Sequence, residues 1–179
     1  AVLEPAVRRL GLEGRPDLHV GVISYAADAR IEGPLARSTE RVAAAIRNIR
    51  TRQGSCLSCG LVEAVRMLRA ARGGRDASAL RDVVLLASAG TDVGCEAVRT
   101  IAIEARAYGI VVVTTCQGSH RDCGCMSDAA AQSRYVLQLA AWEALEDRLL
   151  DLVDSRGLFH PIDEVVLEDA LAPGFAYLD

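Results

Sequence analysis

The chain has 179 residues, 51% of them apolar and 25% charged, and its formal net charge at pH 7 is −4. This balance is typical of a folded globular protein and argues against disorder. The acidic charge argues against nonspecific binding to nucleic acid, which needs a basic surface. No apolar run approaches the roughly 18 residues of a membrane-spanning helix, so we expect no transmembrane segment in this chain.

The first half of the chain predicts helices on either side of two adjacent strands. Apolar residues recur at helical spacing from Val2 to Leu12, and Ser38 is placed to cap a helix that begins at Thr39. Pro34 has no backbone N–H, so it predicts that the second strand lies at a sheet edge. The predicted elements are helices over 2–12, 39–49 and 57–71 and strands over 18–26 and 28–35.

The second half continues the alternation of strands and helices. The runs D-V-V-L-L-A from Asp82 and I-V-V-V-T-T from Ile110 are apolar, as in the central strands of a parallel sheet. We therefore expect an α/β fold, a Rossmann-like parallel sheet with helices on both faces, and a short β segment at the C-terminus. The predicted elements are strands over 82–87, 110–115 and 135–139, helices over 95–107 and 141–153, a loop over 117–128, and a strand, turn and strand over 163–179.

Several of these segments, in this order, resemble the strands and loops of von Willebrand factor A domains. The resemblance covers about residues 1–154, and it implies a ligand-binding or assembly module rather than an enzyme. The segments that carry it are V-G-V-I-S-Y-A-A-D-A-R-I-E-G-P-L (20–35), the helix that begins after Ser38, G-S-C-L-S-C-G-L (54–61), V-V-L-L-A-S-A-G (83–90) and R-A-Y-G-I-V-V-V-T-T (106–115).

The resemblance also implies a divalent-cation site in three loops at the carboxyl ends of the strands, but this chain departs from the family's pattern there. The first loop, an Asp-x-Ser-x-Ser, is not in the chain. Ser55 stands where the family has threonine, Ser88 stands where it has aspartate, and Asp92 could substitute from the same loop. Because Mg²⁺ and Mn²⁺ are held by carboxylate and hydroxyl oxygens, we expect a degenerate metal site and no cofactor.

The family's first strand, which lies at the centre of its sheet, is also not in the chain. Without it two strands would leave backbone groups unpaired, so we expect the strand to precede Ala1, or alternatively to come from another chain. Residues 1–154 would then be the main domain without its first strand, and residues 155–179 a linker and the start of a second, β-rich region. That end of the chain resembles the opening of conserved β-sandwich repeats in bacterial surface proteins, at Asp169, Leu171, Pro173, Gly174, Phe175 and Tyr177.

Six cysteines, with the close pairs C-x-x-C and C-x-C, predict disulfides in an oxidising compartment. A zinc site and a redox-active pair are the alternatives, and the sequence does not choose among the fifteen pairings that six cysteines allow. If the resemblance holds, all six fall at the carboxyl edge of the sheet, where disulfides would crosslink the loops of the ligand face. The cysteines are Cys56, Cys59, Cys95, Cys116, Cys123 and Cys125.

These observations favour a non-enzymatic adhesion or assembly module of a larger secreted or cell-surface structure, which binds a protein partner or assembles with itself. One alternative is a metal-dependent ligand-binding domain of the family's usual kind. The other is a thiol–disulfide oxidoreductase that uses Cys56 and Cys59, because these cysteines lie at the start of a helix, where the helix dipole favours a thiolate.

Overall fold

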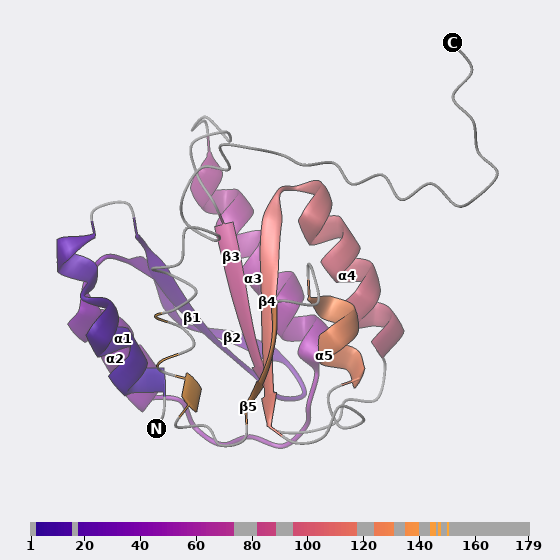
Figure 1. The fold of residues 1–179 in the computed structure, drawn as a ribbon, viewed down its shortest axis with the longest axis horizontal. Helices are drawn as coiled ribbons and strands as arrows, with labels where there is room; N and C mark the ends of the chain where they lie inside the picture. Colours follow the sequence, from indigo (N-terminus) through magenta and orange to yellow (C-terminus); the bar gives the residue numbers. More distant parts are fainter. Residues whose placement is uncertain are drawn as a thin grey trace, which may run out of the picture.

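The structure, a computed structural model, describes residues 3–15, 18–73, 82–88, 95–117, 124–130 and 135–139, together with residues 144, 145, 147 and 150. This part of the chain contains both helices and strands, and from residue 57 onward they alternate (Figure 1). In chain order the elements are α1 (Leu3–Leu10), the short 3-10 helix η1 (Leu12–Gly14), β1 (Val20–Tyr25), β2 (Ala29–Ala36), α2 (Thr39–Arg47), α3 (Leu57–Arg72), β3 (Asp82–Ser88), α4 (Cys95–Ala107), β4 (Ile110–Gln117), α5 (Gly124–Ala129) and β5 (Val136–Leu139).

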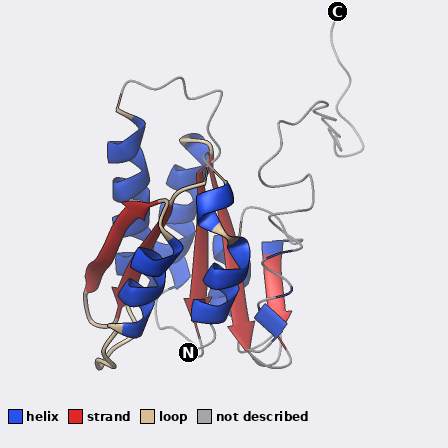
Figure 2. Cartoon of the chain, turned by 90° about the vertical axis from the view of Figure 1, so that its left-hand side faces the viewer, coloured by secondary structure: helices blue, strands red, loops and turns tan. Residues whose placement is uncertain are grey.

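The strands β3, β4 and β5 form a parallel sheet in that order. β3 pairs with β4 along its whole length, from Asp82 opposite Ile110 to Ser88 opposite Cys116. β5 joins the far side of β4, beginning with Val136 opposite Thr114. Because parallel strands run the same way, β3 and β4 finish at one edge of the sheet (Figure 2). The continuous apolar runs therefore lie where the sequence predicts central parallel strands.

The strands β1 and β2 form an antiparallel hairpin, from Tyr25 opposite Ala29 at the turn to Val20 opposite Ala36. The pairing is irregular between Val20 and Ile23, where the register shifts twice. Among the described strands, β2 pairs only with β1, so the prediction from Pro34 that this strand lies at an edge is confirmed.

Helices cover the strands on both faces, with α1 and α2 on one side and α4 and α5 on the other (Figure 1). Alternate residues of β3 and β4 point to opposite faces. Val84, Leu86 and Val112 belong to the core cluster formed with α3, α4 and α5, whereas Val113 packs with Tyr135 on the other face. The expectation of an α/β fold with a parallel sheet between helices is confirmed.

The helices α1 and α2 cover the hairpin and form a separate apolar cluster with it. Val7 and Leu10 of α1, Leu12 of η1 and Val42 of α2 are buried against the partly buried β1 residue Val22. The Ser38 hydroxyl accepts a hydrogen bond from the Arg41 backbone N–H at 3.4 Å, as expected of the cap of α2.

Among the described strands, no hydrogen-bonded pairing joins β1 to β3. β1 is paired only with β2, and β3 only with β4. The side chain of Tyr25 joins the two parts, because its hydroxyl donates to the carbonyl of Ala87 at 2.6 Å. The origin of a further strand stays a prediction, as do the boundaries of the domain.

The loop predicted over 117–128 is partly wrong. β4 extends to Gln117, and residues 124–130 contain the helix α5. This helix is only six residues long, and Cys125, Met126 and Ala129 are buried in the core, so tertiary packing rather than local propensity accounts for it. The helix α2 is also shorter than predicted and ends at Arg47. Most of the helix predicted over 141–153, and the whole segment 155–179, lie outside the described residues.

Candidate functional site

Tyr25 joins three elements at the edge of the sheet where β1 and β3 end. Its hydroxyl donates to the Ala87 carbonyl near the end of β3, and its ring lies against the first turn of α3 at Gly60. A Cβ on Gly60 would lie 2.9 Å from Cδ1 of Tyr25, so a larger residue would displace the ring or the helix. The last residue of β1 therefore fixes the start of α3 against the end of β3.

The loop before α3 is fixed to the β1–β2 turn by backbone hydrogen bonds. The N–H of Cys56 donates to the Ala26 carbonyl at 2.6 Å, and the N–H of Ala27 donates to the Gln53 carbonyl at 3.1 Å. Gly54 has φ +102°, and a Cβ there would lie 2.5 Å from the Ala27 nitrogen. Glycine is required at this position, because the backbone conformation and the close approach both exclude a side chain.

Two of the three residues that the family's metal pattern indicates lie at this edge. Ser55 is exposed in the loop before α3, and Ser88 is the last residue of β3, next to the carbonyl that Tyr25 binds. Asp92 lies outside the described residues. Within the described part of the chain, no group of three His, Cys, Asp or Glu side chains could hold a metal ion.

Two disulfides are present among the described residues, so the expectation of disulfide bonds is confirmed. Cys56 is bonded to Cys59 within the start of α3. Cys95, the first residue of α4, is bonded to Cys125 in α5. The second bond joins two elements that follow successive strands of the sheet, whereas the first is local and crosslinks no separate loops. Cys123 and the side chain of Cys116 lie outside the description.

A polar cluster next to this edge was not predicted from the sequence. The Arg52 guanidinium donates to the Ser24 hydroxyl at 3.1 Å and contacts the Asp28 carboxylate. The Ser24 hydroxyl in turn donates to the Glu32 carboxylate at 2.5 Å. These contacts fix the loop that precedes α3 to the hairpin. A polar residue in a loop gives the same sequence pattern whether its side chain is solvated or bound to another element. No sequence signal therefore identifies Arg52 as part of this cluster.

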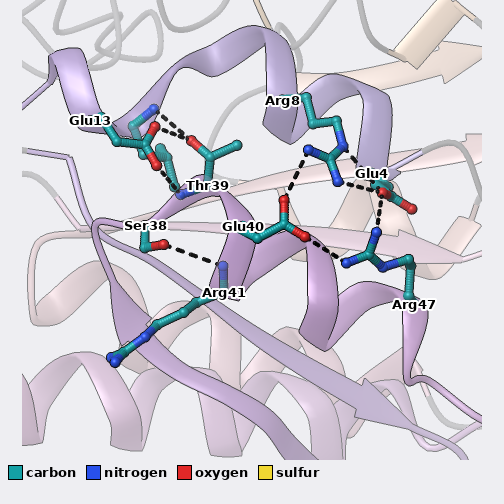
Figure 3. Close-up of polar contacts among 9 residues, drawn as sticks. Glu4, Arg8, Glu13, Ser38, Thr39, Glu40, Arg41 and Arg47 are labelled. Carbon is teal, nitrogen blue, oxygen red and sulfur yellow. Dashed lines mark hydrogen bonds and ion pairs between the residues drawn. The ribbon is translucent and has the colours of Figure 1, made fainter.

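Ion pairs join α1 to α2 on the face of the hairpin that these two helices cover (Figure 3). Glu40 accepts from Arg47 at 2.7 Å and from Arg8 at 3.1 Å, and Arg8 also donates to Glu4 at 3.0 Å. The hydrogen bond from Arg47, followed by that from Arg8, holds the pKa of Glu40 below its ordinary value. Since these groups are exposed, salt would screen the network.

A second carboxylate ties η1 to the start of α2 (Figure 3). Glu13 accepts from the Thr39 backbone N–H at 2.8 Å and from the Thr39 hydroxyl at 2.5 Å. The hydroxyl hydrogen bond is the main cause that lowers the pKa of Glu13. Both carboxylates are thus engaged in contacts between elements, and we assign them a structural role.

Comparisons with known proteins agree on the fold. The family model described as von Willebrand factor type A domain matches residues 2–150. Proximal thread matrix protein 1 from the mussel byssus is similar with 19% identity and a TM-score of 0.69, over 85% of this chain and 41% of that chain. This chain therefore spans less than half of the mussel protein. The same protein with a zinc-occupied MIDAS motif is similar with 20% identity and a TM-score of 0.68, over 85% of this chain and 42% of that chain.

Two further solved structures are similar over most of their own length. BatB from Bacteroides thetaiotaomicron has 15% identity and a TM-score of 0.58, over 86% of this chain and 87% of that chain. The SpRpn10 VWA domain has 12% identity and a TM-score of 0.58, over 77% of this chain and 75% of that chain. A comparison with curated protein sequences gave no match. None of the helices in the described ranges has the length and apolarity needed to span a membrane.

Proposed function

Because this chain belongs to the von Willebrand factor type A domain family, whose members mediate protein–protein interactions, we propose that it is a non-enzymatic adhesion or assembly module of a larger extracellular structure. Its binding surface is the edge where β1 and β3 end. The observation that carries the proposal is that the Tyr25 hydrogen bond and the Cys95–Cys125 disulfide crosslink elements of this edge, which limits their motion. A rigid surface binds with a smaller loss of conformational entropy than a mobile one.

The disulfides support the extracellular part of the proposal. Disulfides persist in oxidising compartments and are rare where thiols are kept reduced. The likeness to a matrix protein of the mussel byssus supports assembly into a larger structure, and we therefore propose self-association as the form of binding.

The proposed binding needs no metal ion. Ser55 and Ser88 offer neutral hydroxyls at positions where the family has a threonine and an aspartate. A hard divalent cation is held mainly by charged carboxylate oxygens, so two serines supply too little negative charge. Metal-dependent binding is the alternative, favoured by the similar structure with a zinc-occupied MIDAS motif, and it would require a carboxylate such as Asp92.

Sedimentation velocity of the full chain over a range of concentrations, in EDTA and in Mg²⁺, tests the proposal. We expect concentration-dependent association that is equal in both buffers. Ser55→Arg places a large charge on the exposed loop of the edge and should weaken association by about tenfold or more, the effect of losing roughly 1.4 kcal/mol. Ala107→Arg is the control, because Ala107 is exposed at the end of α4, next to the start of β4. It therefore lies near the opposite edge of the sheet from the proposed binding surface.

Three outcomes would contradict the proposal. A monomer at every concentration would exclude self-association, and association only in Mg²⁺ would establish the metal-dependent alternative. Equal weakening by both arginine variants would place the contact elsewhere on the surface.

A further inference from the structure

The two disulfides differ in their surroundings. Cys125 is only 6% exposed, and Cys95 packs against the same core cluster. Cys56 and Cys59 are both partly exposed, and their bond closes a loop between residues three positions apart, against thirty for Cys95–Cys125. A thiol in solution can therefore reach either sulfur of Cys56–Cys59 in the folded protein, whereas in the other bond Cys125 is buried and only Cys95 is partly exposed.

The start of α3 can stabilise Cys56 as a thiolate. Its Sγ accepts a hydrogen bond from the backbone N–H of Cys59 at 3.2 Å and lies 3.4 Å from the Ser58 hydroxyl. The sixteen-residue helix has no acidic side chain in its first turn, so nothing in that turn opposes a negative charge on sulfur. A thiol that is stabilised as its thiolate is a good leaving group in disulfide exchange.

The surroundings of the bond do not depend on it. The N–H of Cys56 is bound to the Ala26 carbonyl, the next residue, Leu57, is 1% exposed, and Gly60 lies against Tyr25. Reduction would leave these contacts in place, so the two sulfurs stay close and the bond can form again.

We propose that Cys56–Cys59 is a thiol–disulfide exchange site, which reacts with an external dithiol while Cys95–Cys125 stays intact. The proposal does not rest on the binding function above. One thiolate of the dithiol attacks Sγ of Cys59, a sulfur–sulfur bond forms between them, and Sγ of Cys56 leaves as a thiolate. The second thiolate of the dithiol then attacks the first sulfur of the dithiol in the mixed disulfide and releases Sγ of Cys59 as a thiolate. The dithiol becomes a cyclic disulfide, and Cys56 and Cys59 take up the two protons as thiols.

Timed reduction of the folded full chain by dithiothreitol, followed by alkylation and tryptic mass mapping, tests the proposal. The chain has no lysine, so trypsin cuts only after arginine, and peptide 53–66 carries Cys56 and Cys59 with no other cysteine. Cys95 falls in peptide 82–99 and Cys125 in peptide 122–134. We expect peptide 53–66 to gain two alkyl groups at least about tenfold faster than peptides 82–99 and 122–134 lose the disulfide that links them. The circular dichroism spectrum of the chain should stay unchanged meanwhile. Equal rates, or reduction only in denaturant, would overturn the proposal.

A pair of charge variants tests the role of the Cys56 thiolate. Ser58→Asp places a carboxylate beside Sγ of Cys56, and Val62→Asp places the same charge one turn further along α3, at a residue that is 46% exposed. We expect Ser58→Asp to slow reduction of Cys56–Cys59 by about threefold or more and Val62→Asp to have a smaller effect, because the repulsion falls with distance. If both variants react as fast as the wild type, Cys56 is not the leaving group in this exchange.

Discussion

Glu40 is held by two arginines, Arg8 of α1 and Arg47 of α2. We predict that Arg47→Gln raises the pKa of Glu40 toward its ordinary value of 4.5, because the strongest hydrogen bond to the carboxylate is lost. Arg41→Gln is the control, since the Arg41 side chain points away from Glu40 (Figure 3). Carbon-detected NMR titration measures both shifts, and an unchanged pKa in Arg47→Gln would show that the ion pair does not persist in solution.

The same lowered pKa gives the direction of the pH dependence. Glu40 binds a proton more weakly in the folded chain than in the unfolded chain, so its contribution to stability is complete above the ordinary value of 4.5 and is lost as the pH falls through the lower folded value. Arg47→Gln should therefore flatten the loss of stability in acid, as followed by thermal unfolding across this pH window.

The Tyr25 hydroxyl contributes to stability through its hydrogen bond to the Ala87 carbonyl, which joins the two parts of the sheet. We predict that Tyr25→Phe lowers the free energy of unfolding by about 1–2 kcal/mol, because the ring remains while the Ala87 carbonyl loses its donor. Tyr108→Phe is the matched control: this side chain is 36% exposed, and its ring keeps its contact with the Arg69 guanidinium. Urea unfolding measures both variants, and equal losses would contradict the assignment.

The helix α3 can approach β1 closely only because residue 60 is glycine. Alanine would gain about 1 kcal/mol of helix propensity, but its Cβ would lie 2.9 Å from the Tyr25 ring. We predict that Gly60→Ala nonetheless destabilises the fold by about 1–3 kcal/mol through overpacking. Gly14→Ala is the control, because a Cβ there meets no atom within 4 Å. A stabilised Gly60→Ala variant would show that the helix shifts freely.

The two disulfides should differ in their effect on stability. The entropy of the unfolded chain decreases more when a longer loop is closed. Replacing Cys95 and Cys125 by alanine should therefore cost about 4 kcal/mol, and replacing Cys56 and Cys59 about 2 kcal/mol. Urea unfolding without reductant compares the two double variants. A larger loss of stability for the Cys56 and Cys59 variant would show that loop closure in the unfolded chain does not set the effect of these disulfides.

The elements that the sequence predicted correctly are those with local causes. Pro34 indicated an edge strand because it lacks an N–H, and Ser38 indicated a helix start because its hydroxyl can accept from the first turn. The helix α5 has no such signal, since its stability comes from the core and from a bond to Cys95. Of the candidate site, the positions of Ser55 and Ser88 followed from the order of strands and loops, whereas the Cys95–Cys125 pairing required the fold itself.

At the scale of the whole molecule, the described sheet is in two parts that are joined by helix α3 and by Tyr25. Val65 of α3 belongs to the core under β3, and Met67 of the same helix reaches Gly21 of β1. The arrangement places the loop of Ser55 and the end of β3 at one edge, which is the edge that we propose binds a protein surface. We propose that this edge binds its partner without a metal ion.

Isothermal titration of the full chain with MgCl₂ and MnCl₂ shows whether this edge binds a metal ion. Ser55 and Ser88 supply hydroxyls but no charge, so we predict no saturable heat at concentrations of about 1 mM, which corresponds to a binding free energy weaker than about 4 kcal/mol. Ser88→Asp restores the carboxylate of the family pattern and should increase any measurable affinity. A saturable heat for the wild type, with one site per chain, would contradict the claim and establish the edge as a metal site.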